Sequence, residues 1–98
     1  MVYNSIMIKS FKHKGLKRFY ETGSIKGIQA IHSSRLNLLL ASLDAMTQID
    51  DLKAPSFRLH KLSGDKKEFW SITVQANWRI VFKFENSNVY VVDYLDYH

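Results

Sequence analysis

Residues 78–85 read WRIVFKFE, and this stretch decides the fold class. Large apolar side chains occupy every second position, and three of the four positions between them are charged. A period of two is typical of a strand that buries one face and exposes the other. The predicted buried face carries Trp78, Ile80, Phe82 and Phe84.

The rest of the second half is predicted to form strands as well. Alternating runs cover residues 57–60 and 70–75. The Asn-Ser-Asn sequence of residues 86–88 predicts a hairpin turn before a last strand at residues 89–94. Strands joined by short turns pair antiparallel, so we expect an antiparallel sheet.

The first half is predicted to be helical. Apolar residues recur at helical spacing across residues 30–47, with no proline or glycine among them. A shorter basic helix is predicted within residues 12–20, ending near Gly23, and residues 6–11 could form a first strand. Turn-forming residues at 50–55 separate the two halves. This order predicts an α+β fold in which two N-terminal helices pack on one face of a twisted, mainly antiparallel sheet.

Length and composition indicate a single cytoplasmic domain. A chain of 98 residues suffices for one hydrophobic core, so we expect one domain over residues 1–98. Regular patterning starts at Met7, and residues 1–6 are interpreted as an N-terminal extension. The absence of cysteine excludes a disulfide framework. No run is long and apolar enough for a membrane span or a secretion signal, so we expect no contact with a membrane.

Positive charge is concentrated in the predicted helical half. Residues 1–43 contain seven Lys and Arg against one acid, whereas residues 44–98 contain seven against eight acids. The net charge of +5 therefore comes from the first half. Basic helices of this kind can contact ribosomal RNA, an acidic segment of a partner protein, or both in exclusive states.

The predicted polar face of the sheet is the first candidate binding surface. Its members are cationic or hydrogen-bonding, namely Arg58, His60, Ser71, Thr73, Gln75, Arg79 and Lys83. Such a face on rigid strands suits RNA phosphates and exposed bases. An ordinary solvated sheet face would have the same pattern, so the sequence leaves both interpretations open.

Histidine is the side chain that ordinarily titrates near neutral pH, and the chain contains four, at His13, His32, His60 and His98. Their spacing matches no metal-binding motif, and no glycine-rich phosphate loop is present, so we expect neither a metal nor a cofactor. Basic neighbours favour the neutral form of His60, as a general base requires, but an isolated strand histidine is more often a surface or hydrogen-bonded residue. His98 lies in a polar terminal group that is either catalytic or a frayed tail.

Five segments, taken in order, carry a family resemblance. They are MIKSFKHKGL at 7–16, HKLSGD at 60–65, WSITV at 70–74, NWRI at 77–80 and DYH at 96–98. In this set the chain resembles the HigB toxins of the RelE-like superfamily, ribosome-dependent mRNA interferases of bacterial type II toxin–antitoxin systems. The resemblance implies the RelE-like microbial ribonuclease fold, and residues 1–6 lie outside it.

The resemblance implies an endoribonuclease that cuts mRNA in the A site of the 70S ribosome and so inhibits translation. It also implies a HigA-type antitoxin with a helix-turn-helix domain, through which any contact with DNA would be indirect. The implied catalytic residues are His60, Asp96, Tyr97 and His98.

The resemblance also implies RNA contacts at Asn77 and Arg79. Some relatives carry a lysine three residues after the catalytic histidine, where this chain has Ser63. A cationic contact to phosphate at this position is then either missing or supplied by Lys61, Lys66 or Lys67. The complete predicted RNA-binding set is Arg58, Lys61, Lys66, Lys67, Asn77 and Arg79.

Metal-independent cleavage would use the RNA 2′-hydroxyl as nucleophile and leave a 2′,3′-cyclic phosphate and a 5′-hydroxyl. Two histidines can exchange the protons, Asp96 could act as base or orient an imidazole, and Arg79 could stabilise charge on the phosphorane. Two other classes remain open on the sequence, a non-catalytic RNA- or ribosome-binding module and a structural subunit of a regulatory complex.

Overall fold

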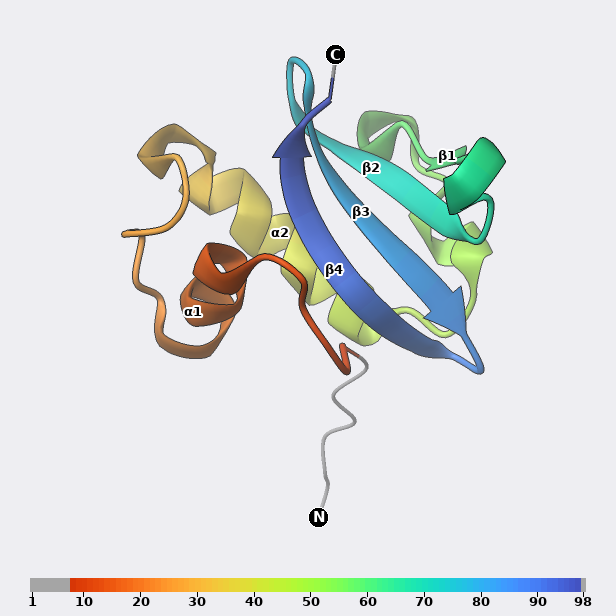
Figure 1. Cartoon of the computed structure of the whole chain (residues 1–98), viewed down its shortest axis with the longest axis horizontal. Coiled ribbons are helices and arrows are strands. Elements are labelled where there is room, and N and C mark those ends of the chain that lie inside the picture. Colours follow the sequence, from red (N-terminus) through yellow and green to blue (C-terminus); the bar gives the residue numbers. More distant parts are fainter. Residues whose placement is uncertain (1–7, 98) are drawn as a thin grey trace.

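The computed structural model describes residues 8–97 and confirms the α+β class. Two helices precede a four-stranded sheet of order β1-β2-β3-β4, in which every pairing between strands is antiparallel (Figure 1). The elements are α1 (Lys14–Thr22), α2 (Ser33–Ala45), β1 (His60–Lys61), β2 (Phe69–Gln75), β3 (Trp78–Glu85) and β4 (Asn88–Asp96). Short 3-10 helices lie at Ala30–His32, Ile49–Leu52, Pro55–Phe57 and Gly64–Lys66.

Side-chain and glycine caps determine the bounds of the first helix. The His13 side chain accepts a hydrogen bond from the Leu16 N–H at 2.9 Å and so caps the first turn. Gly23 ends the helix in a left-handed conformation, with φ 81°, and donates its N–H to Phe19. This confirms the predicted helix end near Gly23.

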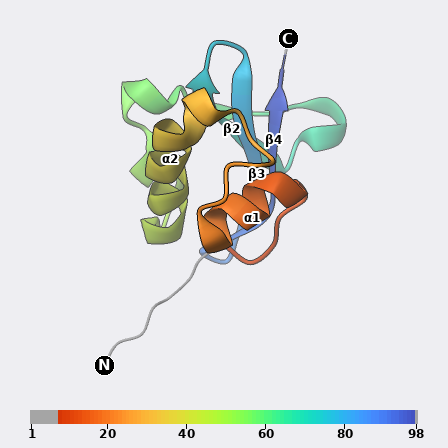
Figure 2. The same ribbon diagram turned by 90° about the vertical axis from the view of Figure 1, so that its left-hand side faces the viewer.

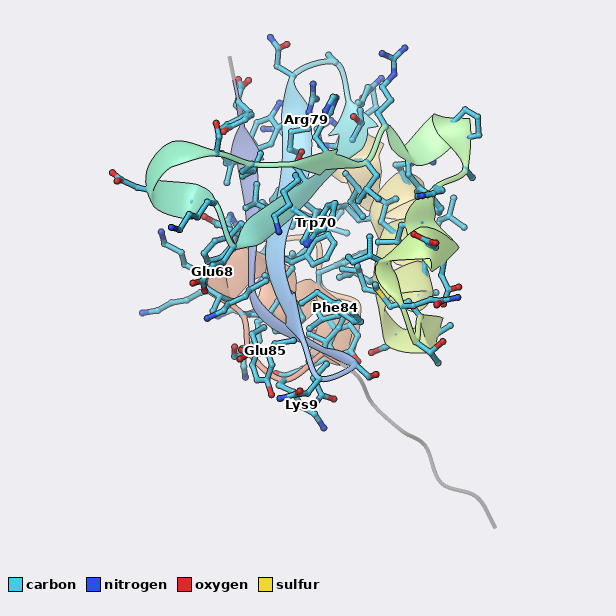
Figure 3. The ribbon with its side chains drawn as sticks, turned by 90° about the vertical axis from the view of Figure 1, so that its right-hand side faces the viewer. Lys9, Glu68, Trp70, Arg79, Phe84 and Glu85 are labelled. Atoms are coloured by element: carbon cyan, nitrogen blue, oxygen red, sulfur yellow. The ribbon has the colours of Figure 1, made fainter. Side chains whose placement is uncertain are left out.

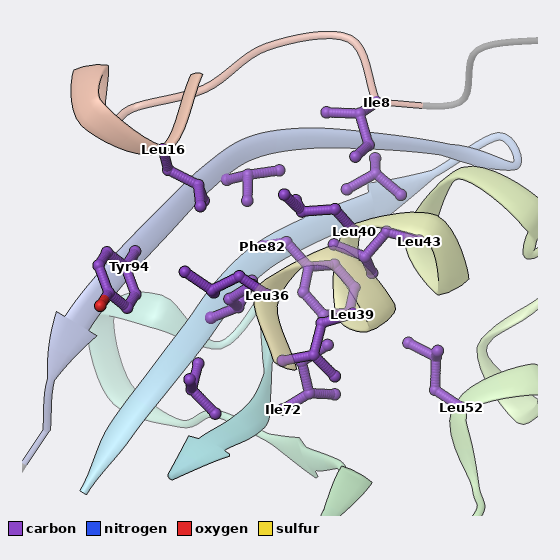
Figure 4. Packing of buried hydrophobic residues seen from close by; sticks show 14 of the residues in the cluster. Ile8, Leu16, Leu36, Leu39, Leu40, Leu43, Leu52, Ile72, Phe82 and Tyr94 are labelled. Atoms are coloured by element: carbon purple, nitrogen blue, oxygen red, sulfur yellow. The ribbon is translucent and has the colours of Figure 1, made fainter. Parts of the chain in front are cut away.

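The core lies between the helices and one face of the sheet (Figure 4). On the strands, Ser71 and Val81 are only 2% and 3% exposed, so the middle of β2 and β3 is buried on both faces and the prediction that one face is exposed is wrong there. Ile72, Ile80 and Phe82 are completely buried on the face predicted to form the core. Their partners are leucines at helical spacing on α2 and apolar residues of α1. The helical contributors are Leu16, Phe19, Leu36, Leu39, Leu40 and Leu43.

Two predicted strands are wrong in part. The predicted strand at 57–60 is reduced to His60–Lys61, because Pro55 starts a 3-10 turn and Arg58 adopts a left-handed conformation with φ 48°. Of the predicted strand at 6–11, the described part makes only isolated parallel bridges from Ile8 and Phe11 to β4. The rest of that strand, and the predicted extension, lie outside the described residues.

A bulge bends β4 midway along its length. Val81 pairs with Asp93 whereas Lys83 pairs with Tyr90, so β4 has one more residue than β3 in this interval. Val91 lies in the bulge with φ 54°, and its N–H donates to Ser10 Oγ at 2.8 Å. The bulge increases the local twist of β4 ahead of the segment that contains Asp96 and Tyr97.

Two glycines allow the segment after α1 to return across the start of that helix, on the side of the molecule seen in Figure 2. A Cβ atom added to Gly15 would lie 2.7 Å from the Gly27 Cα, and one added to Gly27 would lie 2.5 Å from the Gly15 Cα. Both distances are shorter than any van der Waals contact, and the opposing atoms belong to the backbone. Only glycine therefore fits at either position.

We predict that Gly15→Ala destabilises the protein by about 1–3 kcal/mol, because the methyl group forces two backbone segments apart. Urea unfolding followed by circular dichroism measures the change. Gly23→Ala is the matched control, since its Cβ meets nothing within 4 Å and only the positive φ opposes it; we expect a loss of about 1 kcal/mol there. A smaller loss for Gly15→Ala than for the control would contradict the assigned close approach.

Candidate active site

One lateral row of the sheet crosses all four strands. His60 on β1 pairs with Ser71, Ser71 pairs with Val81, and Val81 pairs with Asp93. Paired residues of antiparallel strands share a face. The row therefore lies on the face opposite Ile80 and the helices, which we call the open face.

Arg79 lies in the next row of the open face. It pairs with Leu95 on β4, and Tyr97 follows Leu95 at the same alternation, with its N–H donating to the Asn77 carbonyl at 2.8 Å. From the rise per residue and the strand spacing, the Arg79 Cα lies about 12 Å from that of His60 and about 8 Å from that of Tyr97. Arg79 is thus between the two, within reach of a ligand that touches both.

The centre of the open face is covered, and its exposed polar groups lie on either side. Ser71 and Val81 are only 2% and 3% exposed. His60 is exposed on the edge strand, and Tyr97 is 43% exposed at the end of β4. This arrangement differs from an evenly solvated sheet face, in which the central row would also be wet.

The Arg79 guanidinium is partly fixed by the turn between β2 and β3. Its Nη1 donates to the Ala76 carbonyl at 2.6 Å and to the Trp78 carbonyl at 3.2 Å. A guanidinium has five N–H donors. Among the described residues these bonds involve Nη1 alone, so the remaining donors are oriented and can contact a phosphate.

The other predicted catalytic residues are placed differently. Asp96 pairs with Trp78, and alternation along β4 puts it on the same side as Tyr94, opposite Tyr97. It is the exposed last residue of the strand. His98 lies outside the described residues. The structure therefore brings His60, Arg79 and Tyr97 to one face and puts Asp96 at its margin.

The predicted cationic residues of the 58–67 segment are all exposed. Arg58 caps the 3-10 turn at Pro55–Phe57. The Lys66 ammonium lies 5.4 Å from the centre of the Phe69 ring, and Lys67 is exposed one residue later. These side chains extend the positive charge along the β1 side of the molecule.

Lys61 alternates to the opposite face from His60, because it pairs with Trp70. Its ammonium lies 5.0 Å from the centre of the Trp70 ring, a cation–π contact. Both residues line a hollow of about 300 Å³. The other lining residues are Glu68, Lys83, Phe84 and Glu85.

The hollow is electrostatically balanced. Lys83 pairs with Glu68 at 3.1 Å and with Glu85 at 3.8 Å. The hydrogen bond and the charge of Glu68 raise the pKa of Lys83 above its ordinary value. Figure 3 shows that these acidic residues lie toward the other end of the sheet from Arg79. The charge of Lys83 is therefore neutralised by carboxylates, although alternation along the strand predicted it among the cations of the polar sheet face.

The histidines separate into different roles. His13 caps α1, and His32 is buried, with 4% exposure, where its Nδ1 lies 2.7 Å from the Tyr94 hydroxyl. Neither presents its imidazole to the open face, whereas His60 does. No local pattern predicts the His32–Tyr94 contact, since the two residues are far apart in the chain.

Comparison with known proteins places this geometry in a family. A family described as the RelE-like toxin of the type II toxin–antitoxin system HigB matches residues 9–98. The chain belongs to this HigB-like toxin family. It is 49% identical over 92 residues to the protein named Endoribonuclease HigB of Proteus vulgaris, covering 94% of this chain and all of the relative.

The fold is shared with a solved structure of low sequence identity. The YoeB–YefM complex from Staphylococcus aureus contains a chain that superimposes with a TM-score of 0.62 at 16% identity, covering 96% of this chain and 98% of that one. This similarity extends to the fold and confirms the RelE-like architecture of the HigB-like chain.

Residues 8–97 of this family member contain neither a membrane-spanning helix nor a cluster of metal ligands. No helix in that range is long and apolar enough to cross a membrane. Across the same part of the chain, no three histidine, aspartate or glutamate side chains gather as metal ligands.

Proposed function

We propose that this endoribonuclease toxin of the HigB family cleaves mRNA in the A site of the 70S ribosome, with the RNA 2′-hydroxyl as nucleophile. The observation that carries the proposal is the strand register, which aligns His60, Arg79 and Tyr97 on the open face. The 49% identity to Endoribonuclease HigB supports the same chemistry.

Cleavage requires two proton transfers and stabilisation of one negative charge. A base takes the proton of the 2′-hydroxyl, whose oxygen forms a new bond to the adjacent phosphorus. The bond from phosphorus to the 5′-oxygen breaks, and an acid protonates that oxygen. His60 and His98 supply these two functions. The products are a 2′,3′-cyclic phosphate and a 5′-hydroxyl.

The other site residues orient the groups that react. Arg79 donates N–H groups to the pentavalent phosphorane, where negative charge develops. Tyr97 positions the phosphate or a base through its exposed ring and hydroxyl. Asp96, at the margin of the open face, orients an imidazole or takes a proton. Asn77 and the basic side chains of residues 58–67 contact the RNA on either side.

Dependence on the ribosome follows from the openness of this site. His60 and Tyr97 are exposed and separated by the covered centre of the sheet, so the protein alone does not enclose a flexible RNA. An A site that presents mRNA already bent supplies the orientation that the small domain lacks.

The antitoxin is proposed to bind the helical side of the molecule. Ile31 and Leu38 are 75% and 52% exposed there, and α1 presents exposed Lys14, Lys17 and Arg18. We propose a HigA-type helix-turn-helix antitoxin that covers this side with an acidic amphipathic segment, matching both the charge and the apolar side chains. DNA is reached only through that antitoxin. Bound there, the antitoxin blocks access to the ribosome and leaves His60 uncovered.

We predict that His60→Ala lowers the rate of mRNA cleavage by about 10²–10⁴-fold, the usual contribution of a general acid or base, and that removal of His98 has a similar effect. Primer extension on translating ribosomes measures codon-phased cuts. His60 is exposed, so urea unfolding should match wild type, and Lys53→Ala, in an exposed ion pair, serves as an unaffected control. Full cleavage by both variants would overturn the assignment, and blocked translation without cuts would favour a non-catalytic binding module.

A second prediction separates the charge of Arg79 from its bonds to the turn. Arg79→Ala removes the stabilising donor and should lower the single-turnover cleavage rate by about 10²–10³-fold. Arg79→Lys retains the charge without the oriented donors, so we expect a loss of about tenfold. Equal losses in the two variants would instead assign the effect to the hydrogen bonds to Ala76 and Trp78.

The antitoxin surface is tested by a double substitution. Ile31→Glu with Leu38→Glu should weaken antitoxin binding by at least about tenfold, through lost burial and like-charge repulsion, while cleavage is unchanged. Isothermal calorimetry measures the affinity. Ala54→Glu, an exposed position outside the helices, is the control for added charge. Protection of His60 by the antitoxin, with Lys14 and Lys17 unprotected, would place the antitoxin on the open face.

A further inference from the structure

A buried hydroxyl–imidazole pair lies directly behind the end of β4. The Tyr94 hydroxyl and the His32 Nδ1 are 2.7 Å apart, and each residue is only 4% exposed. The Gln29 N–H donates to the same hydroxyl at 3.2 Å. The Tyr94 side chain thus joins β4 to the segment between the two helices.

The Tyr94 hydroxyl has two hydrogen-bond partners. Its oxygen accepts from the Gln29 N–H, and it shares a hydrogen bond with the His32 Nδ1 in which the imidazole tautomer decides the donor. Burial raises the pKa of Tyr94 above its ordinary value, so the hydroxyl stays protonated across the physiological range.

Aromatic contacts connect Tyr94 and His32 to β3, the strand that pairs with the end of β4. The Trp78 ring lies 4.8 Å from the Tyr94 ring and 5.5 Å from the His32 ring, and the His13 ring meets Tyr94 at 5.2 Å. Trp78 is the residue that pairs with Asp96. The cluster therefore packs behind the β-bridge that holds the last residue of β4.

Tyr94 is the last buried side chain among the described residues. Beyond it Leu95 is half-buried, and Asp96 and Tyr97 are exposed. Strand β4 is at the edge of the sheet, and the parallel bridges on its outer side end at Phe11 and Val92. Past this point the backbone is held by β3 and by the turn before it.

We propose that His32 and Tyr94 are positioning residues, which hold the end of β4 so that Tyr97 and the groups beside it meet the RNA at a fixed place. The inference rests on the proposed function, since it concerns the geometry of the same site. The pair touches neither RNA nor the reacting atoms, and it acts through the backbone of residues 95–97. Without the hydroxyl, the Gln29 N–H and the His32 Nδ1 lose their partner, and the chain end loses its last buried anchor.

The test is Tyr94→Phe, which keeps the ring and removes one oxygen. We expect kcat for ribosome-dependent cleavage to fall about tenfold with KM for the ribosome–mRNA complex unchanged, because binding surfaces remain while the end of β4 moves. Amide hydrogen exchange at Tyr97, whose N–H donates to Asn77, should accelerate by a similar factor. Exchange at core amides of α2 reports global stability in the same experiment.

Tyr20→Phe is the matched control. It removes another tyrosine hydroxyl, which donates to Asp44 at 2.7 Å in a contact between α1 and α2 that involves no residue of β4. It should leave both kcat and the exchange rate of Tyr97 at wild-type values. A second pair of variants tests the imidazole, since His32→Asn retains an acceptor near the Nδ1 position and should preserve more activity than His32→Leu.

The outcomes separate this inference from the proposed function. Suppose that wild type cleaves mRNA and that Tyr94→Phe leaves both kcat and the amide exchange rate of Tyr97 unchanged. This result would overturn the positioning role alone. Equal losses in Tyr94→Phe and Tyr20→Phe, or equal losses in the two His32 variants, would reduce the pair to general stability and also overturn it. Absence of cleavage by wild type on translating ribosomes would overturn the proposed function itself.

Discussion

The burial of Ile80 and Phe82 against the α2 leucines is the constraint on which the active site depends. Both side chains are completely buried, and alternation then forces Arg79 to the other face. A register slip of one residue would turn the guanidinium into the core, where an unpaired charge costs several kcal/mol. The register of β3 also determines which face its neighbouring strands present. Pairing through Ser71 places His60, and pairing through Leu95 places Tyr97, on the same face as Arg79. The core thus determines the face that presents the candidate site residues.

The sequence predicts those parts of the fold that local periodicity encodes. The alternation of β3 and the leucine spacing of α2 follow from burial of a single face, so pattern alone located both. The strand at His60–Lys61 is different, because it exists only through pairing with β2 and has too few residues to show a period. Arg58 turns the chain just before it, a left-handed conformation that no neighbouring glycine or proline announces.

Site residues were predictable to the extent that strand parity governs them. The alternation of side chains along the strands and the family resemblance together predicted His60, Arg79 and Tyr97 as site residues. The strand register places these three on the same face. Parity could not show that Lys61 packs on Trp70, or that Lys83 is neutralised by Glu68, because those contacts depend on side-chain reach across strands. The His32–Tyr94 contact is non-local for the same reason. Positive charge counted along the chain therefore overstates the charge available to RNA.

The placement of reactive groups at an exposed strand end imposes a requirement on the packing behind it. Terminal residues fray unless buried contacts oppose it, and Asp96 and Tyr97 provide little burial of their own. Both side chains are exposed, so packing around them does not hold them in place. Order at this end must therefore come from the covered side, where Trp78 and Tyr94 pack against His32. Under the proposed function the ribosome orients the substrate, but the protein still has to orient its own proposed catalytic groups, and in so small a domain the aromatic cluster behind β4 is the element placed to do so.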